Sequence, residues 1–206
     1  MAQPQPQTHQ QQQHQQQQQP KIPTRKEAED ESVVPVPQAG DRAPSLGDQV
    51  HFPSDKPVLV VFLRHCGCPF AEKTFRTLSN LSNHHPEIQF IAISQSTQED
   101  TDKWIVQVGG EWDVLVLADP DRTLFHAWGL GLSSTWYALN PVALWNTWKL
   151  GTDEGIWNRS SNSGSRWQIG GAFAVDRDGL VTWAKPAQSA DEVPDFKEAL
   201  RALGRR

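Results

Sequence analysis

The sequence predicts an α/β domain in which a central sheet of mixed strand direction is flanked by helices. Three apolar runs, 58–63, 88–94 and 114–117, are each followed by a segment with helix-start signals. The chain then closes with a hairpin pattern at 171–183 and a helical pattern at 195–203. Alternating strands and helices favour parallel pairing, whereas a hairpin pairs its strands antiparallel. Both directions are therefore expected in one sheet.

The clearest strand signal is the run 58–63, Val-Leu-Val-Val-Phe-Leu. It is apolar on both faces and rich in β-branched residues, which is typical of a central strand with parallel neighbours. Pro69 follows at a place that fits the first helical position, where its missing N–H costs nothing. Apolar residues then recur at helical spacing, which predicts an amphipathic helix over 69–83.

The following units carry their own boundary signals. Ser96-Thr97-Gln98-Glu99 is typical of a capping box and predicts a helix over 97–108. Gly109-Gly110 should end that helix, because glycine readily takes the left-handed conformation of a C-terminal cap. Residues 119–121 form an Asp-Pro-Asp turn, which should start a short helix through Trp128.

Other segments give weaker signals. Residues 49–52 are expected to form a short strand, and 134–150 a helix that Pro141 kinks or splits. The Gly/Ser/Asn-rich stretch 152–165 is expected to be a mobile loop. Asp-Arg-Asp-Gly at 176–179 supplies the turn of the terminal hairpin.

The two ends of the chain differ in composition. Residues 1–40 begin with a glutamine-rich tract and continue with charged residues, proline and alanine. Such a segment has little apolar surface to bury against the entropy cost of ordering. We expect a disordered Gln/Pro-rich tail over 1–40 and one domain over 41–206, which is long enough for a single core.

Composition also argues against several partners and locations. The net charge is −5 and no basic stripe occurs, which disfavours nucleic acid. The N-terminus has no apolar signal-peptide core, and the longest apolar run is too short to span a bilayer. Two cysteines two residues apart do not resemble a secreted disulfide framework. We expect a cytoplasmic protein that binds neither nucleic acid nor membrane.

The only two cysteines, Cys66 and Cys68, lie between the first predicted strand and the helix that Pro69 opens. A helix N-terminus stabilises an anion through its unpaired N–H groups and its dipole. A thiol there should ionise more easily than free cysteine, whose pKa is about 8.5. The carboxyl end of a strand is also where ligands bind in α/β sheets. The pattern indicates a reactive thiol site, and the alternative for Cys68 is a small buried apolar residue.

No bound cofactor or metal is expected. His84-His85 have no third ligand nearby, and one Cys-x-Cys pair is a poor zinc signal. Six of the nine tryptophans lie between residues 128 and 167. Core packing and an aromatic-lined pocket for an apolar ligand both account for them.

Three stretches resemble one known family. Residues 39–46 resemble the peroxiredoxin entry segment, and 62–72 resemble the Arg-His-x-Gly-Cys-Pro-Phe-Cys signature of peroxiredoxin-like proteins. Residues 170–179 resemble the strand and hairpin that finish the family's sheet. The chain is thus similar to the thioredoxin superfamily, and within it to the peroxiredoxin-like branch of the AhpC/TSA (alkyl hydroperoxide reductase/thiol-specific antioxidant) family. The resemblance implies a thioredoxin-like fold with a C-terminal β-hairpin and helix.

On this resemblance Cys68 is the reactive thiol, whose thiolate is oxidised to a sulfenic acid. Cys66 would then resolve it, or an external thiol such as glutathione or thioredoxin would. Ala71 stands where the thioredoxin-type Cys-x-x-Cys pattern has its second cysteine. His65 and Val61 stand where the peroxiredoxin pattern has a Thr or Ser and a Pro.

Other side chains are expected around this thiol. Arg64 is a candidate charge partner for the thiolate or the peroxide, or else a solvated strand end. His65 is a candidate base or hydrogen-bond donor, or else a loop residue. The expected substrate-binding residues are Pro69, Phe70, Arg166 and Trp167.

The resulting hypothesis is a thiol-dependent oxidoreductase that reduces a peroxide or a related electrophile, with a homodimer as one possible assembly. Two alternatives stay open. One is a tailoring enzyme for a bulky apolar molecule, such as an endoperoxide or a secondary metabolite. The other is a non-catalytic thioredoxin-like binding module that uses the glutamine-rich tail for contacts.

Overall fold

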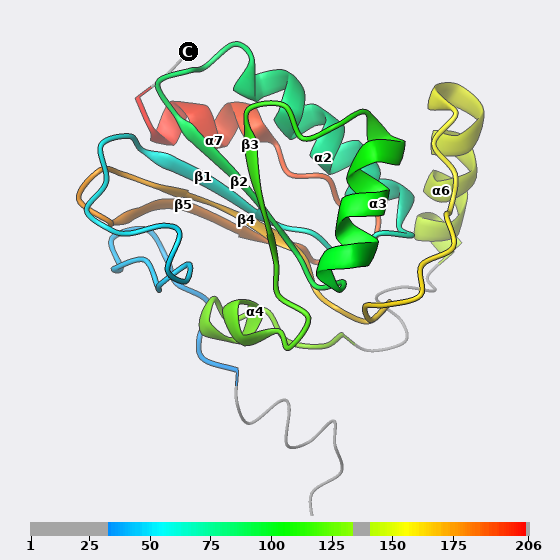
Figure 1. The fold of residues 1–206 in the computed structure, drawn as a ribbon, viewed down its shortest axis with the longest axis horizontal. Coiled ribbons are helices and arrows are strands. Elements are labelled where there is room, and N and C mark those ends of the chain that lie inside the picture. Colours follow the sequence, from blue (N-terminus) through cyan, green and yellow to red (C-terminus); the bar gives the residue numbers. More distant parts are fainter. Residues whose placement is uncertain (1–32, 134–140, 205–206) are drawn as a thin grey trace, which may run out of the picture.

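The computed structural model describes residues 33–133 and 141–204. Its centre is a five-stranded sheet in the order β3-β2-β1-β4-β5 (Figure 1). The strands are β1 (Val58–Phe62), β2 (Gln89–Ser94), β3 (Val114–Ala118), β4 (Gly171–Val175) and β5 (Val181–Pro186). The first three are parallel, while β4 runs antiparallel to both β1 and β5. The predicted α/β class with a mixed sheet is confirmed.

Strand β1 lies in the middle of the sheet, as its apolar pattern predicts. All five of its residues are buried. Val60 is paired with Ile91 on one side and with Phe173 on the other. The chain therefore leaves the centre of the sheet at Phe62, which brings the following residues to the carboxyl end of a buried strand.

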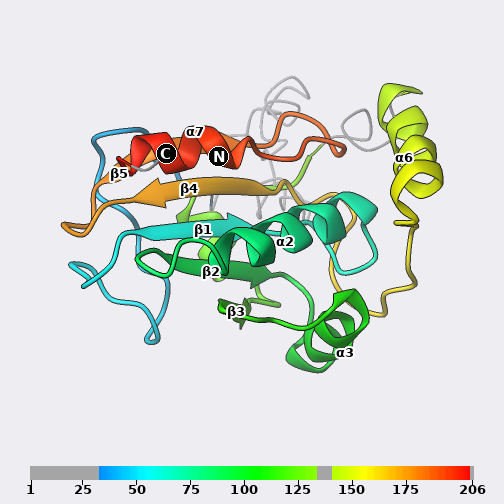
Figure 2. The ribbon, with the colours of Figure 1, turned by 90° about the horizontal axis from the view of Figure 1, so that it is seen from above.

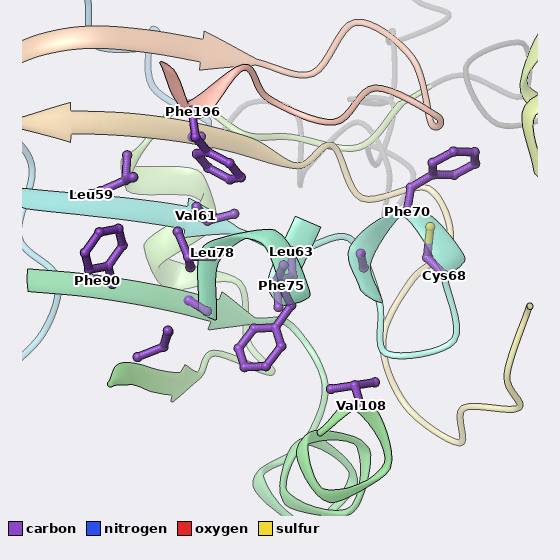
Figure 3. Close-up of a cluster of buried hydrophobic side chains, with 14 of the residues drawn as sticks. Leu59, Val61, Leu63, Cys68, Phe70, Phe75, Leu78, Phe90, Val108 and Phe196 are labelled. Carbon is purple, nitrogen blue, oxygen red and sulfur yellow. The ribbon is translucent and has the colours of Figure 1, made fainter. Parts of the chain in front are cut away.

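Helices cover both faces of the sheet, as Figures 1 and 2 show. They are α2 (Pro69–Ser82), α3 (Gln98–Val108), α4 (Thr123–Ala127), α6 (Pro141–Glu154) and α7 (Phe196–Ala202). One apolar cluster joins Leu59 and Val61 of β1 to side chains of α2, α3 and α7 (Figure 3). The opposite face packs on α4, where Phe62 lies against Phe125, its ring centroid 5.0 Å away. Successive residues of β1 thus pack alternately into the two apolar clusters, one on each face of the sheet.

Several boundaries differ from the sequence prediction. Residues 49–52 form no strand, and the entry segment is joined to the sheet by a bridge between Arg42 and Leu180 instead. Helix α3 is capped by Thr97, whose side chain accepts a hydrogen bond from the backbone N–H of Asp100, and not by Ser96. Ser96 is fully buried, and its hydroxyl donates to the carbonyl of Ser163 at 3.4 Å instead of capping the helix.

Two further differences concern proline and the predicted tail. Helix α6 begins at Pro141 and continues to Glu154, into the stretch predicted as loop. Proline suits a first turn, and α6 starts at the residue where the sequence predicted a kink or a split. Residues 134–140 of the predicted helix and 1–32 of the predicted tail lie outside the described residues. Within 33–40, backbone N–H groups of Val34 and Gly40 donate to the domain, so contacts begin before residue 41.

Candidate active site

Cys68 lies at the junction between the sheet and α2, as the sequence predicts. It is the N-cap residue of α2 with extended backbone angles, and Pro69 takes the first helical turn. Its N–H donates to the carbonyl of His65 at 2.9 Å, which closes the turn after β1. The residue is only 3 % exposed. Figure 3 shows Cys68 beside Phe70 at one end of the apolar cluster. The sulfur therefore lies at a helix N-terminus but largely out of bulk solvent.

The guanidinium of Arg64 contacts this sulfur. Its Nη1 lies 3.2 Å from Sγ of Cys68 and 3.2 Å from the carbonyl oxygen of Ala190. Its Nη2 donates to the carbonyl of Arg166 at 2.6 Å. Two carbonyls from distant segments thus hold the cation against the thiol. A guanidinium at this distance can donate a hydrogen bond to the sulfur and can offset negative charge that develops there.

Cys66 has different neighbours. It is a free, buried thiol whose Sγ lies 3.5 Å from Oγ of Ser94 on β2. Thr101 of α3 also donates to that hydroxyl. The two thiols therefore face different groups: Cys66 packs toward the sheet and α3, whereas Cys68 lies with Arg64. Both thiols are free, and both belong to the same buried cluster.

His65 is buried beside the cysteine turn. Burial first, and then the positive charges of Arg64 and Arg166, lower the pKa of His65 from 6.5 to about 4. Its Nδ1 accepts a hydrogen bond from the backbone N–H of Gly67 at 3.0 Å. A neutral imidazole that accepts at Nδ1 carries its proton on Nε2. At neutral pH this side chain is therefore an uncharged hydrogen-bond donor.

A cavity of about 450 Å³ opens next to Cys68. Every residue proposed from the sequence except Cys66 lines it: Arg64, His65, Cys68, Pro69, Phe70, Arg166 and Trp167. Helix α6 supplies Ala143, Leu144 and Thr147 to its wall. The cavity combines arginine side chains near the sulfur with an apolar wall, and its volume lies in the range of small-molecule sites.

Sequence reasoning missed Glu72 and Arg159. The side chain of Glu72, in the first turn of α2, is only 2 % exposed, and Arg159 donates to both of its carboxylate oxygens, at 2.8 and 3.2 Å. Arg76 adds an ion pair at 2.6 Å. The i,i+4 spacing of Glu72 and Arg76 was a readable signal. No sequence signal pointed to Arg159, because it lies in a segment without helical or strand periodicity.

Within 33–133 and 141–204, no group of three or more His, Cys, Asp or Glu side chains is placed to hold a metal ion. Among the same residues, no helix is long and apolar enough to cross a membrane.

Comparison with solved structures shows the fold. A peroxiredoxin-like protein from Aquifex aeolicus is 14 % identical with a TM-score of 0.60, over 84 % of this chain and 89 % of that one. A thiol peroxidase from Chromobacterium violaceum is 17 % identical with a TM-score of 0.57, over 84 % and 89 %. The peroxidoxin BcpB from Mycobacterium tuberculosis is 17 % identical with a TM-score of 0.55, over 82 % and 97 %. The sheet and its helices are thus those of a thioredoxin-like fold.

Sequence comparison identifies the family. No curated protein matches the chain. The model of the AhpC/TSA antioxidant enzyme family matches residues 76–189, which is more than half of the sequence. The match begins after Cys68, so it rests on the remainder of the domain and not on the cysteine turn. On this evidence the chain belongs to the AhpC/TSA antioxidant enzyme family.

Proposed function

We propose that this protein is a thiol peroxidase in which Cys68 is the attacking residue. The observation that carries the proposal is the contact of 3.2 Å between Nη1 of Arg64 and Sγ of Cys68 at the start of α2. The helix N-terminus and a fixed guanidinium both favour an anionic sulfur there. The adjoining cavity gives a peroxide room to approach that sulfur.

The proposed chemistry has two stages. The Cys68 thiolate attacks one peroxide oxygen, so that an S–O bond forms and the O–O bond breaks. The leaving oxygen takes up a proton and departs as water or an alcohol. Arg64 neutralises charge at the reacting atoms, and the neutral His65 can donate a hydrogen bond from Nε2. That donor would serve in place of the Thr or Ser hydroxyl of the peroxiredoxin pattern.

An external thiol is the proposed reductant. The contact of Cys66 Sγ with Ser94, and of Cys68 Sγ with Arg64, favours an external thiol over Cys66 as the resolving group. The thiol would displace the sulfenic oxygen of Cys68 as water and form a mixed disulfide, which a second thiol reduces. Glutathione and thioredoxin are the candidates. Both systems are named for the yeast mitochondrial 1-Cys peroxiredoxin, which is 14 % identical to this chain with a TM-score of 0.52.

The substrates proposed include organic hydroperoxides as well as hydrogen peroxide. A cavity of about 450 Å³ is larger than hydrogen peroxide requires. Its apolar wall, with Phe70, Leu144 and Trp167, suits a carbon skeleton next to the peroxide group.

The test compares Cys68→Ser with Cys66→Ser. Peroxide consumption is followed with dithiothreitol as the reductant, for hydrogen peroxide and for cumene hydroperoxide. We expect Cys68→Ser to abolish turnover of both peroxides and Cys66→Ser to retain it. Mass spectrometry after mild peroxide treatment should find one added oxygen on Cys68 in the Cys66→Ser protein. Unchanged turnover in Cys68→Ser would show that the proposed mechanism is wrong.

A further inference from the structure

A segment without regular structure covers the cysteine turn. We call residues 155–167 the covering segment. Its Asn158, Arg159, Arg166 and Trp167 line the cavity beside Cys68. The backbone N–H of Arg159 donates to the carbonyl of Gly67 at 3.1 Å, which docks the segment directly on the turn. Although the sequence suggests a mobile loop, this segment forms one wall of the site.

The contact at Gly67 leaves no room for a side chain. A Cβ atom at position 67 would overlap the carbonyl oxygen of Arg159. The backbones of the turn and the covering segment therefore lie in direct contact. Since Cys68 is the next residue, the position of the covering segment limits what can approach its sulfur.

Several contacts tether the covering segment, including hydrogen bonds at Ser163 and at the carbonyl of Arg166. Two further tethers lie near its ends. At one end, Gln95 accepts a hydrogen bond from the N–H of Ser165 at 2.7 Å and donates to the carbonyl of the same residue at 2.6 Å. At the other end, Arg159 donates two hydrogen bonds to Glu72 of α2. The hydrogen bonds of Gln95 join neutral groups. Those from Arg159 to Glu72 are charge-assisted, so each of them is stronger.

The carboxylate of Glu72 needs partners because it is buried. Arg159 approaches it from the covering segment, whereas Arg76 approaches it from the next turn of the same helix. Of these two ion pairs, only that of Arg159 links α2 to the covering segment, whose Ile156 also belongs to the apolar cluster that includes α2 side chains. Each arginine can neutralise the carboxylate when the other is removed, so loss of the link can be separated from loss of a charge partner.

We propose that Glu72 and Arg159 are a positioning pair that holds the covering segment closed over Cys68 and so controls access of bulky thiols to its sulfur. The pair is a structural element of the site and does not touch the reacting atoms. The consequence for reduction rests on the proposed function. A small peroxide could reach Sγ with the segment closed, whereas a bulky thiol would need the Arg159 end to open before its sulfur could bond to that of Cys68.

The experiment measures alkylation of Cys68 in a Cys66→Ser background, so that one thiol is counted. Iodoacetamide is the small reagent and fluorescein maleimide is the bulky one. We expect Arg159→Gln to raise the bulky-to-small rate ratio about tenfold, the size of effect for losing a charge-assisted hydrogen bond. Arg159→Lys, which keeps the charge but loses the paired geometry, should give an intermediate ratio. Arg76→Gln, the matched control, should leave the ratio unchanged.

Hydrogen exchange gives a second reading that does not depend on a reactive thiol. Amides of residues 156–167 should exchange faster in Arg159→Gln than in Arg76→Gln, because only the first variant loses the link. Equal exchange in the two variants, or an unchanged alkylation ratio in Arg159→Gln, overturns the proposal. If neither reagent labels Cys68 in any variant, the proposed function fails, and the exchange comparison by itself decides whether the pair holds the segment.

Discussion

The buried His65 should make the protein less stable in mild acid. Its side chain is neutral when folded, with a pKa of about 4 in place of 6.5, mainly because burial disfavours the charged imidazolium. The substitution His65→Asn tests this. The Oδ1 of asparagine can still accept the hydrogen bond that the N–H of Gly67 donates to Nδ1 of the histidine. The variant therefore removes the titration while keeping the local contact.

The sign and size follow from proton linkage. Because the folded-state pKa of His65 lies below the unfolded value, the unfolded chain binds a proton more readily as the pH falls. Stability is therefore lost as the pH falls from about 6.5 toward 4. For these two pKa values the free energy of unfolding should fall by about 2 kcal/mol at pH 5 and about 3 kcal/mol at pH 4, relative to neutral pH.

Urea unfolding, followed by tryptophan fluorescence between pH 7.5 and 4, measures this loss. As the pH falls, the unsubstituted protein should lose these amounts of unfolding free energy relative to His65→Asn. His84→Asn, at an exposed histidine, is the matched control for a surface position. A difference that stays constant across the pH range would refute the reasoning, because it would mean that His65 binds its proton equally well in both states.

Two further substitutions test the packing and the charge at the site. Gly67→Ala places a methyl group on the carbonyl of Arg159, so it should lower the free energy of unfolding by about 1–3 kcal/mol, the usual range for overpacking; an unchanged melting temperature would contradict the close approach. Arg64→Gln removes the cation that lies 3.2 Å from the sulfur, so it should slow alkylation of Cys68 by iodoacetamide at pH 7 by about tenfold, which corresponds to about 1.4 kcal/mol. An equal rate in the variant would mean that Arg64 does not act on the sulfur.

Much of the fold could be predicted because its signals are local. The apolar run at β1 and the hairpin pattern at 171–183 give strand positions, and Pro69 gives the start of α2. Errors occurred where local signals compete. Ser96 and Thr97 are both good caps, but the hydroxyl of Ser96 bonds to the distant Ser163, and Thr97 caps the helix. At Pro141, by contrast, the start of α6 falls where the sequence predicted a kink or a split.

The candidate site was predictable only in part. The positions of Cys68, Arg64 and His65 follow from their place in the chain, directly after the central strand. The different surroundings of Cys66 and Cys68 do not, although the two residues are only two positions apart. The neighbours of a side chain in a turn depend on what packs against it. Cys66 contacts Ser94 of β2, whereas Cys68 contacts Arg64.

By itself, the sequence determined the order of strands and helices and the position of a cysteine at the N-terminus of α2. Those features depend on residue spacing and backbone preference over a few positions. Only the tertiary structure decided which groups surround that cysteine. Arg64 is held by a carbonyl 126 residues away, and Glu72 is bound by an arginine 87 residues away. Such contacts leave no periodic pattern in the chain, because they form only after separate elements have packed together.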